Sequence, residues 1–205
     1  MILSERRLNV GAAPRLLEAR IAEPAGPPRG GAVVCHPHPE YGGDMHNPVV
    51  LAAVRACLDA GWAALRFNFG GTGASGGGFS GGPEEVGDVA GALAALRSDL
   101  PPATPLAIVG YSFGAWVGTR AACDGGDLSR VIAVAPPLSF FDWTFVGDLH
   151  APFAVIVGDR DQYCRPDRAR ALAIATGAEI ITIPGADHFF AGRDDDVAAA
   201  IRQRL

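Results

Sequence analysis

The segment Leu106–Ala115, LAIVGYSFGA, constrains the fold of this chain more than any other. An apolar run leads directly into Gly110-Tyr-Ser-Phe-Gly114, and small or apolar residues follow. Gly-x-Ser-x-Gly in this context is typical of a tight turn from a buried strand into a helix, with the serine exposed beyond the strand end. A side chain at either glycine would collide with the neighbouring strand or helix. The segment therefore predicts a nucleophilic Ser112 at a sheet edge, with the backbone N–H of Phe113 free to bind an oxyanion.

Two later apolar runs end in polar clusters that contain an acid and a histidine. The run at 153–157 leads into a cluster that includes Asp161, and the run at 179–183 is followed shortly by His188. Such short continuous runs suit strands buried on both faces of a parallel sheet, and open α/β sheets bind ligands at the carboxyl ends of their strands. The order Ser, acid, His predicts Ser112 as nucleophile, His188 as its base and an aspartate that orients His188. Asp159 and Asp161 both lie on the loop after one strand, so either could be this aspartate.

Several further segments occur in a characteristic order over residues 33–190. They are HPHP at 36–39 with YGG at 41–43, RFNF at 66–69 with a glycine-rich loop, the Gly-x-Ser-x-Gly turn, GDRD at 158–161 and GADH at 185–188. Together they resemble the small, cap-less α/β-hydrolases related to dienelactone hydrolase. The resemblance implies an α/β-hydrolase fold with a mostly parallel sheet of about seven or eight strands, helices on both faces and no cap domain. It also implies Asp161 as the acid, because the family's acid lies three positions after the glycine at 158.

The loop after the strand at 31–35 is where a second oxyanion donor is expected. Pro37 and Pro39 have no N–H and cannot donate, which leaves His38, Glu40 and Tyr41. The resemblance implies the backbone N–H of His38, because relatives use the residue two positions after the histidine at the strand end.

Composition limits the kind of protein this can be. At 205 residues the chain suits one domain, 1–205, and its net charge of −5 argues against a nucleic-acid or anionic-membrane partner. The first residues lack the apolar region of a secretory signal, and no apolar stretch approaches the length of a membrane span. The four cysteines are scattered, and those at 35, 57 and 123 suit a reduced core. We therefore expect a cytoplasmic protein.

Apolar periodicity and turn signals predict the remaining elements. Asn47 and Pro48 mark a helix start, and Gly61 marks its end. The predicted strands are 7–13, 15–22, 31–35, 62–69, 106–110, 130–135, 153–157 and 179–183, and the predicted helices are 48–60, 83–98, 113–123, 167–176 and 194–204. The first two strands are expected to form an antiparallel edge hairpin.

Two other motifs admit a different chemistry. His36-x-His38 with Asp44 and His46 superficially resembles a metal site, but no further ligand cluster completes a coordination shell, and we predict no metal. Gly71-x-Gly-x-x-Gly76 matches a dinucleotide fingerprint, but it lies outside the first strand–helix unit and runs on as a long glycine-rich loop. We predict no cofactor.

The residues at 135–151 lie where larger relatives insert a cap, and they are too few to build one. Their aromatic residues could wall an apolar pocket, so Trp143 is a candidate substrate contact, together with Tyr41 and Tyr111. The sequence predicts a serine hydrolase acting on carboxylic esters of small molecules. Thioesters, lactones or amides share the mechanism, and a non-catalytic binding protein with the same fold is the alternative from another class.

Overall fold

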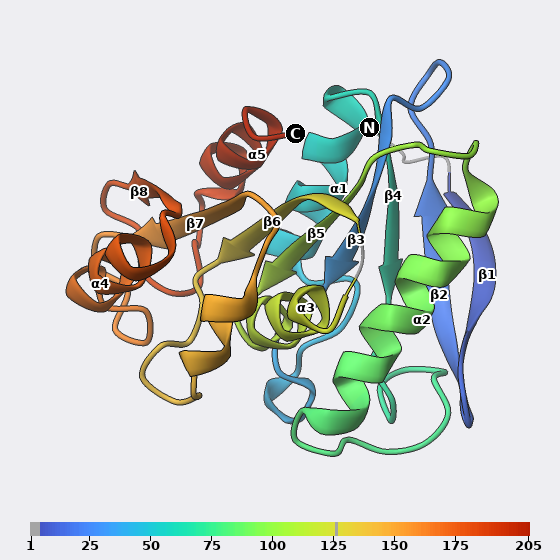
Figure 1. Cartoon of the computed structure of the whole chain (residues 1–205), viewed down its shortest axis with the longest axis horizontal. Helices are drawn as coiled ribbons and strands as arrows, with labels where there is room; N and C mark the ends of the chain where they lie inside the picture. Colours follow the sequence, from blue (N-terminus) through green and yellow to red (C-terminus); the bar gives the residue numbers. More distant parts are fainter. Residues whose placement is uncertain (1–4, 126) are drawn as a thin grey trace.

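The computed structural model describes residues 5–125 and 127–205, and in these residues one eight-stranded sheet lies between two layers of helices (Figure 1). The strand order is β1-β2-β4-β3-β5-β6-β7-β8. The strands are β1 (Glu5–Ala12), β2 (Arg15–Ala22), β3 (Gly30–Cys35), β4 (Trp62–Phe67), β5 (Leu106–Tyr111), β6 (Leu128–Val134), β7 (Phe153–Gly158) and β8 (Glu179–Ile183). The α/β-hydrolase fold predicted from the sequence is confirmed.

The sheet is parallel except at one edge. β1 and β2 form the predicted antiparallel hairpin, and β2 pairs antiparallel with β4. The six strands from β3 to β8 all run parallel to one another. Every residue of β3, β4, β5 and β7 is buried, as expected for strands covered on both faces. β8 was expected to be buried in the same way, and this was wrong. It is the far edge strand, and only Ile183 of its five residues is buried.

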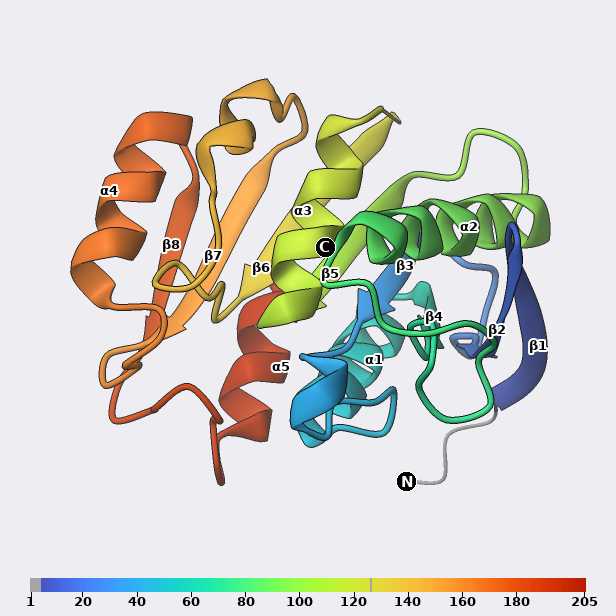
Figure 2. The same ribbon diagram turned by 90° about the horizontal axis from the view of Figure 1, so that it is seen from below.

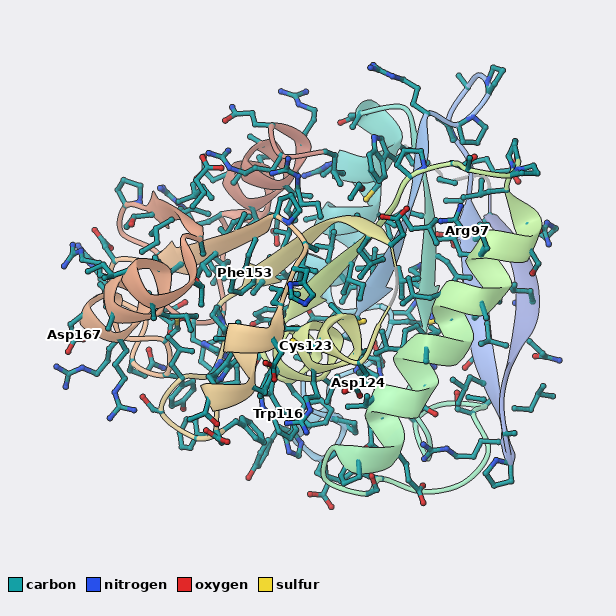
Figure 3. All side chains as sticks on the ribbon, in the orientation of Figure 1. Arg97, Trp116, Cys123, Asp124, Phe153 and Asp167 are labelled. Atoms are coloured by element: carbon teal, nitrogen blue, oxygen red, sulfur yellow. The ribbon has the colours of Figure 1, made fainter. Side chains whose placement is uncertain are left out.

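Helices cover both faces of the sheet. Figure 2 shows α1 (Pro48–Asp59) and α5 (Asp194–Arg202) below it, and α2 (Pro83–Asp99), α3 (Phe113–Cys123) and α4 (Pro166–Thr176) above it. Alternate residues of β5 enter two separate cores, since Ile108 packs towards α2 and α3 whereas Val109 packs towards α1. Side chains fill the space between the sheet and both helical layers (Figure 3). This alternation is the pleat of a strand buried on both sides.

Local signals explain where several elements begin and end. The Asn47 side chain accepts a hydrogen bond from the N–H of Val49, and Pro48 occupies the first turn of α1, as predicted. β4 ends at Phe67, earlier than predicted, because the N–H of Asn68 still bonds to the neighbouring strand β2 but the N–H of Phe69 leaves the sheet. The N–H of Asn68 donates to the carbonyl of Glu18, and that of Phe69 donates to the His36 ring.

The connection between β6 and β7 contains the short 3-10 helix η2 (Thr144–Asp148) and no other helix, all of its residues being described. The sheet edge above Ser112 therefore carries loops rather than a helical cap. Among the described residues, none of the helices has both the length and the apolar character needed to cross a bilayer. All four cysteines are free, and burial raises the pKa of Cys57 to about 12.

Candidate active site

Ser112 lies in the tight turn between β5 and α3, with φ of 53° and ψ of −118°. A positive φ is uncommon for a non-glycine residue and stores strain. A Cβ atom at Gly110 would collide with the backbone of Gly114, and one at Gly114 would collide with the carbonyl of Cys35. The turn therefore needs glycine on both sides, and the strain is held by the close packing of α3 on the sheet.

Ser112, His188 and Asp161 form a continuous chain of hydrogen bonds. The Ser112 Oγ lies 3.0 Å from His188 Nε2, and His188 Nδ1 lies 3.0 Å from Asp161 Oδ2. Asp161 is 2% exposed and His188 is 4% exposed. The carboxylate accepts from Nδ1–H, which leaves Nε2 without a proton and able to accept from the Ser112 hydroxyl. This is the arrangement in which a histidine can remove a proton from a serine.

Backbone groups fix the Asp161 carboxylate. Its Oδ1 accepts hydrogen bonds from the N–H of Tyr163 at 2.8 Å and from that of Cys164 at 2.7 Å. Three partners for one buried carboxylate satisfy its hydrogen-bonding capacity and prevent its rotation. The orientation of His188 therefore depends on a group that is itself fixed.

The alternative acid, Asp159, has a different partner. Asp159 is exposed, and its Oδ1 accepts a hydrogen bond from the N–H of Gly185 at 2.7 Å. Asp187 accepts from the N–H of Phe189 in the same local manner. Only Asp161 among these three carboxylates lies against the His188 ring. Asp159 instead ties the loop after β8 to the loop after β7.

The two predicted oxyanion donors lie on adjoining segments. Within residues 5–125 and 127–205, neither the N–H of Phe113 nor that of His38 donates a hydrogen bond to the protein. The missing side chain at Gly114 lets the start of α3 approach the loop after β3 closely. The His38 ring packs against Phe79 and Phe113, with centroid distances of 4.8 and 5.0 Å. Both N–H groups are therefore free to bind a ligand oxygen.

His36 serves the structure of this loop. It is fully buried, its Nδ1 donates to the Pro37 carbonyl and its Nε2 accepts from the N–H of Phe69. Both ring nitrogens are thus occupied by backbone groups. In the described part of the chain, no group of three or more histidines, cysteines and carboxylates is arranged to hold a metal ion.

Burial lowers the pKa of His36 to about 4. Because an ordinary histidine has a pKa near 6.5, the unfolded chain binds a proton at His36 between pH 6.5 and 4 that the folded chain does not. We expect this one group to remove about 3 kcal/mol from the free energy of unfolding as the pH falls through that range. Urea unfolding at several pH values measures the loss. His36→Gln should flatten the pH dependence, and an unchanged slope in this variant would contradict the assignment.

The glycine-rich loop at 70–82 surrounds a buried arginine. Arg15 donates to the Gly78 carbonyl at 2.9 Å and pairs with Asp88 of α2 at 2.9 Å. A Cβ atom at Gly70 or Gly77 would collide with the Arg15 side chain. These glycines therefore make room for the arginine side chain. The loop also brings Phe79 against the oxyanion segment.

A cavity of about 710 Å³ opens above Ser112. Tyr41 and Tyr111, the other two candidate substrate contacts, line it, and the Tyr111 hydroxyl also donates to the His188 carbonyl at 3.0 Å. Trp143 does not line the cavity, contrary to the prediction. It is buried and stacks on Phe145 in the core beneath η2.

Phe140 and Phe141 of the predicted aromatic segment line this cavity, and so do Tyr163 and Phe189, which the sequence interpretation passed over. The sequence did not reveal which rings of the aromatic segment face the cavity. Tyr163 and Phe189 stand close to Asp161 and His188 in the chain. Proximity in sequence to the acid and the base was the signal that could have found them.

The comparisons with known proteins agree with the geometry. No family model matches the chain. An uncharacterized protein of Rickettsia prowazekii (strain Madrid E) is 33% identical over 201 residues, which cover 92% of this chain and 84% of that protein. At this identity and coverage the two chains share a family.

Solved structures extend the comparison. An α/β serine hydrolase homologue from Coxiella burnetii is 27% identical, covers 100% of this chain and 99% of its own, and superposes with a TM-score of 0.91. A serine hydrolase without a lid from Xanthomonas campestris is 29% identical over 99% of this chain and 94% of its own, with a TM-score of 0.89. Neither is described as a dienelactone hydrolase, and that closer relation stays a prediction. The chain thus belongs to the family of the Rickettsia protein and is a small, lidless α/β hydrolase, homologous to α/β serine hydrolases.

Proposed function

We propose that the chain is a serine hydrolase that cleaves carboxylic esters of small molecules through an acyl-enzyme on Ser112. The observation that carries the proposal is the hydrogen-bonded chain from Ser112 through His188 to the buried Asp161, at the floor of an open cavity. The cavity suits a small substrate because no helical cap covers it in the described residues. The prediction of a cytoplasmic enzyme with a small-molecule partner belongs to the same proposal.

In the first half-reaction, the Ser112 Oγ attacks the ester carbonyl carbon while its proton passes to His188 Nε2. The developing oxyanion accepts hydrogen bonds from the N–H groups of Phe113 and His38. The tetrahedral intermediate then collapses, and the bond from carbon to the alcohol oxygen breaks. That oxygen takes the proton from His188, and the alcohol leaves an acyl group on Ser112.

In the second half-reaction, a water molecule replaces the alcohol. His188 removes a proton from the water as its oxygen attacks the acyl carbon, and the same two N–H groups bind the oxyanion. Collapse breaks the bond to the Ser112 Oγ, which recovers its proton from His188. The carboxylic acid is released, and the enzyme returns to its starting state without a cofactor.

A fluorophosphonate probe tests this proposal directly, because it reacts with a serine only when a neighbouring base activates the hydroxyl. We expect one adduct on Ser112, found by mass spectrometry, and none in Ser112→Ala. Ser98→Ala removes an exposed hydroxyl on α2 and should leave the labelling unchanged. If the folded wild-type protein is not labelled at pH 8, the protein is a non-catalytic binding protein. A panel of matched esters, thioesters, lactones and amides then identifies the bond that is cleaved.

A further inference from the structure

Three aromatic side chains stand beside the general base in the cavity. The Tyr163 ring lies edge-on to His188, with centroids 4.8 Å apart, and contacts Phe140 at 5.2 Å and Phe189 at 6.3 Å. Phe189 also lies edge-on to His188, at 5.6 Å. We call Phe140, Tyr163 and Phe189 the aromatic cluster. It comes from three separate loops, those after β6, β7 and β8.

The aromatic cluster is only partly covered by the protein. Phe140 is 65% exposed and Phe189 is 58% exposed, although Trp143 and Phe145 of the same β6–β7 connection are buried in the core. Backbone hydrogen bonds hold the cluster's loops in place, since the N–H of Ser139 donates to the Tyr163 carbonyl at 3.2 Å. Large apolar side chains gathered at the mouth of a cavity typically mark a site that binds an apolar partner.

The direction of proton transfer identifies which part of an ester lies there. The oxyanion must face the N–H groups of Phe113 and His38, whereas the alcohol oxygen must face His188 Nε2 to receive its proton. The aromatic cluster contacts the His188 ring, and the His38 ring packs against Phe79 and Phe113 on the oxyanion side. The alcohol portion therefore emerges next to the aromatic cluster.

The charge of the cavity wall restricts the ligand further. Among the described residues, the side chains that line the cavity include no lysine, arginine, aspartate or glutamate. Two acids stand beside the base, namely Asp161, which is hydrogen-bonded to His188, and Asp187, which precedes His188 in the chain. A carboxylate on the alcohol portion would find no cation in the cavity wall to pair with, and Asp161 and Asp187 would repel it.

We propose that the aromatic cluster is the leaving-group subsite and selects esters of uncharged, flat alcohols of the arylmethyl class. The inference rests on the proposed function, and it names the portion of the substrate that the cluster binds. Offset and edge-to-face contacts between rings favour a flat aromatic group over a saturated ring of similar size. The bond that breaks is still the bond from acyl carbon to alcohol oxygen, and the proton still comes from His188.

The test compares acetate esters whose alcohols differ in one property. Benzyl acetate and cyclohexylmethyl acetate share a primary alcohol and differ in ring flatness, 4-carboxybenzyl acetate adds a negative charge, and methyl acetate lacks the ring. We expect kcat/KM for benzyl acetate to exceed that for cyclohexylmethyl acetate by about tenfold. The carboxylated ester should be slower than benzyl acetate by at least about tenfold.

Phe140→Leu is the decisive variant, because Phe140 contacts Tyr163 but not His188 in the ring contacts of the cavity and is already mostly exposed. It should lower kcat/KM for benzyl acetate by about threefold or more relative to kcat/KM for methyl acetate, which has no ring to contact Phe140. Ile174→Ala removes an apolar side chain on α4 that is more exposed than Phe140 and lies outside the cavity, and it should change neither rate. Circular dichroism and thermal unfolding establish that both variants fold.

Other outcomes overturn the inference in distinguishable ways. Turnover of methyl acetate without a preference for benzyl acetate contradicts the subsite but not the hydrolase. A second pair of esters, methyl benzoate and methyl acetate, varies the acyl group instead, and a preference for the benzoate that Phe140→Leu abolishes would move the aromatic cluster to the acyl side. Failure of every ester, with no fluorophosphonate labelling of Ser112, contradicts the proposed function and the inference together.

Discussion

Replacing Ser112 with alanine is expected to lower kcat for a cleaved ester by about a millionfold, the loss seen when a comparable serine nucleophile is removed. Without Oγ no acyl-enzyme forms, and water must attack the bound substrate directly. The remaining rate would come from the free N–H groups and from the cavity. Initial rates at saturating ester, measured with enough enzyme to detect a very slow reaction, give kcat for both proteins.

The Ser112→Ala result depends on an intact turn, so stability is its control. Alanine at 112 keeps a Cβ atom at the strained φ of 53° and should leave the free energy of unfolding within about 1 kcal/mol of wild type. Ser98→Ala provides the matched loss of a hydroxyl elsewhere. A Ser112→Ala protein that folds and retains even a hundredth of the activity would show that another group is the nucleophile.

Asp161→Asn is expected to lower kcat by about ten thousandfold, by analogy with the same change at a comparable aspartate. The amide is nearly the same size as the carboxylate but presents an N–H₂ group, which favours the His188 tautomer with its proton on Nε2. That proton would face the Ser112 hydroxyl and block its deprotonation. Steady-state rates and the rate of fluorophosphonate labelling should fall together, because both report activation of Ser112.

Asp159→Asn is the matched comparison, two residues away on the same loop. Its Oδ1 can still accept from the N–H of Gly185, so we expect a loss of less than about tenfold. A larger loss in Asp159→Asn than in Asp161→Asn would reverse the assignment of the acid.

Most of the fold could be predicted from the sequence, because short apolar runs and cap residues are local signals. The boundaries of β2, β7 and β8 match their predicted ranges within one residue. The exposure of β8 could not be predicted in this way. A run such as Glu179–Ile183 has the same apolar character at the centre or edge of a sheet, and only the order of strand pairing determines which side is left uncovered.

The residues of the candidate site could be predicted where they follow a strand end in a characteristic chain order. Ser112 and His188 follow from strand ends and chain order, but Asp159 and Asp161 differ by two positions on one loop. Which of the two reaches His188 depends on how that loop folds. A side chain at Gly158 would collide with the Ala186 carbonyl, and the N–H of Arg160 donates to the same carbonyl. Such contacts between distant segments leave no local signal.

The orientation of the aromatic side chains could not be predicted from the sequence either. A run rich in Phe and Trp indicates a hydrophobic segment but not which rings point inward. Trp143 is buried and stacks on Phe145 in the core, whereas Phe140 is exposed and lines the cavity. The density of aromatic residues in this segment had suggested that both rings line the same pocket wall.

The arrangement of the site at loop ends bears on how such a protein can change over evolution. The reacting groups extend from β5, β7 and β8, whereas much of the cavity wall comes from residues 37–43 and 137–141. Phe140 and Tyr41 are 65% and 87% exposed, so their replacement disturbs little packing. Selection can therefore explore new ligands through a few rim substitutions while the reaction centre stays intact. In this lidless architecture, substrate preference can therefore change with little effect on folding stability.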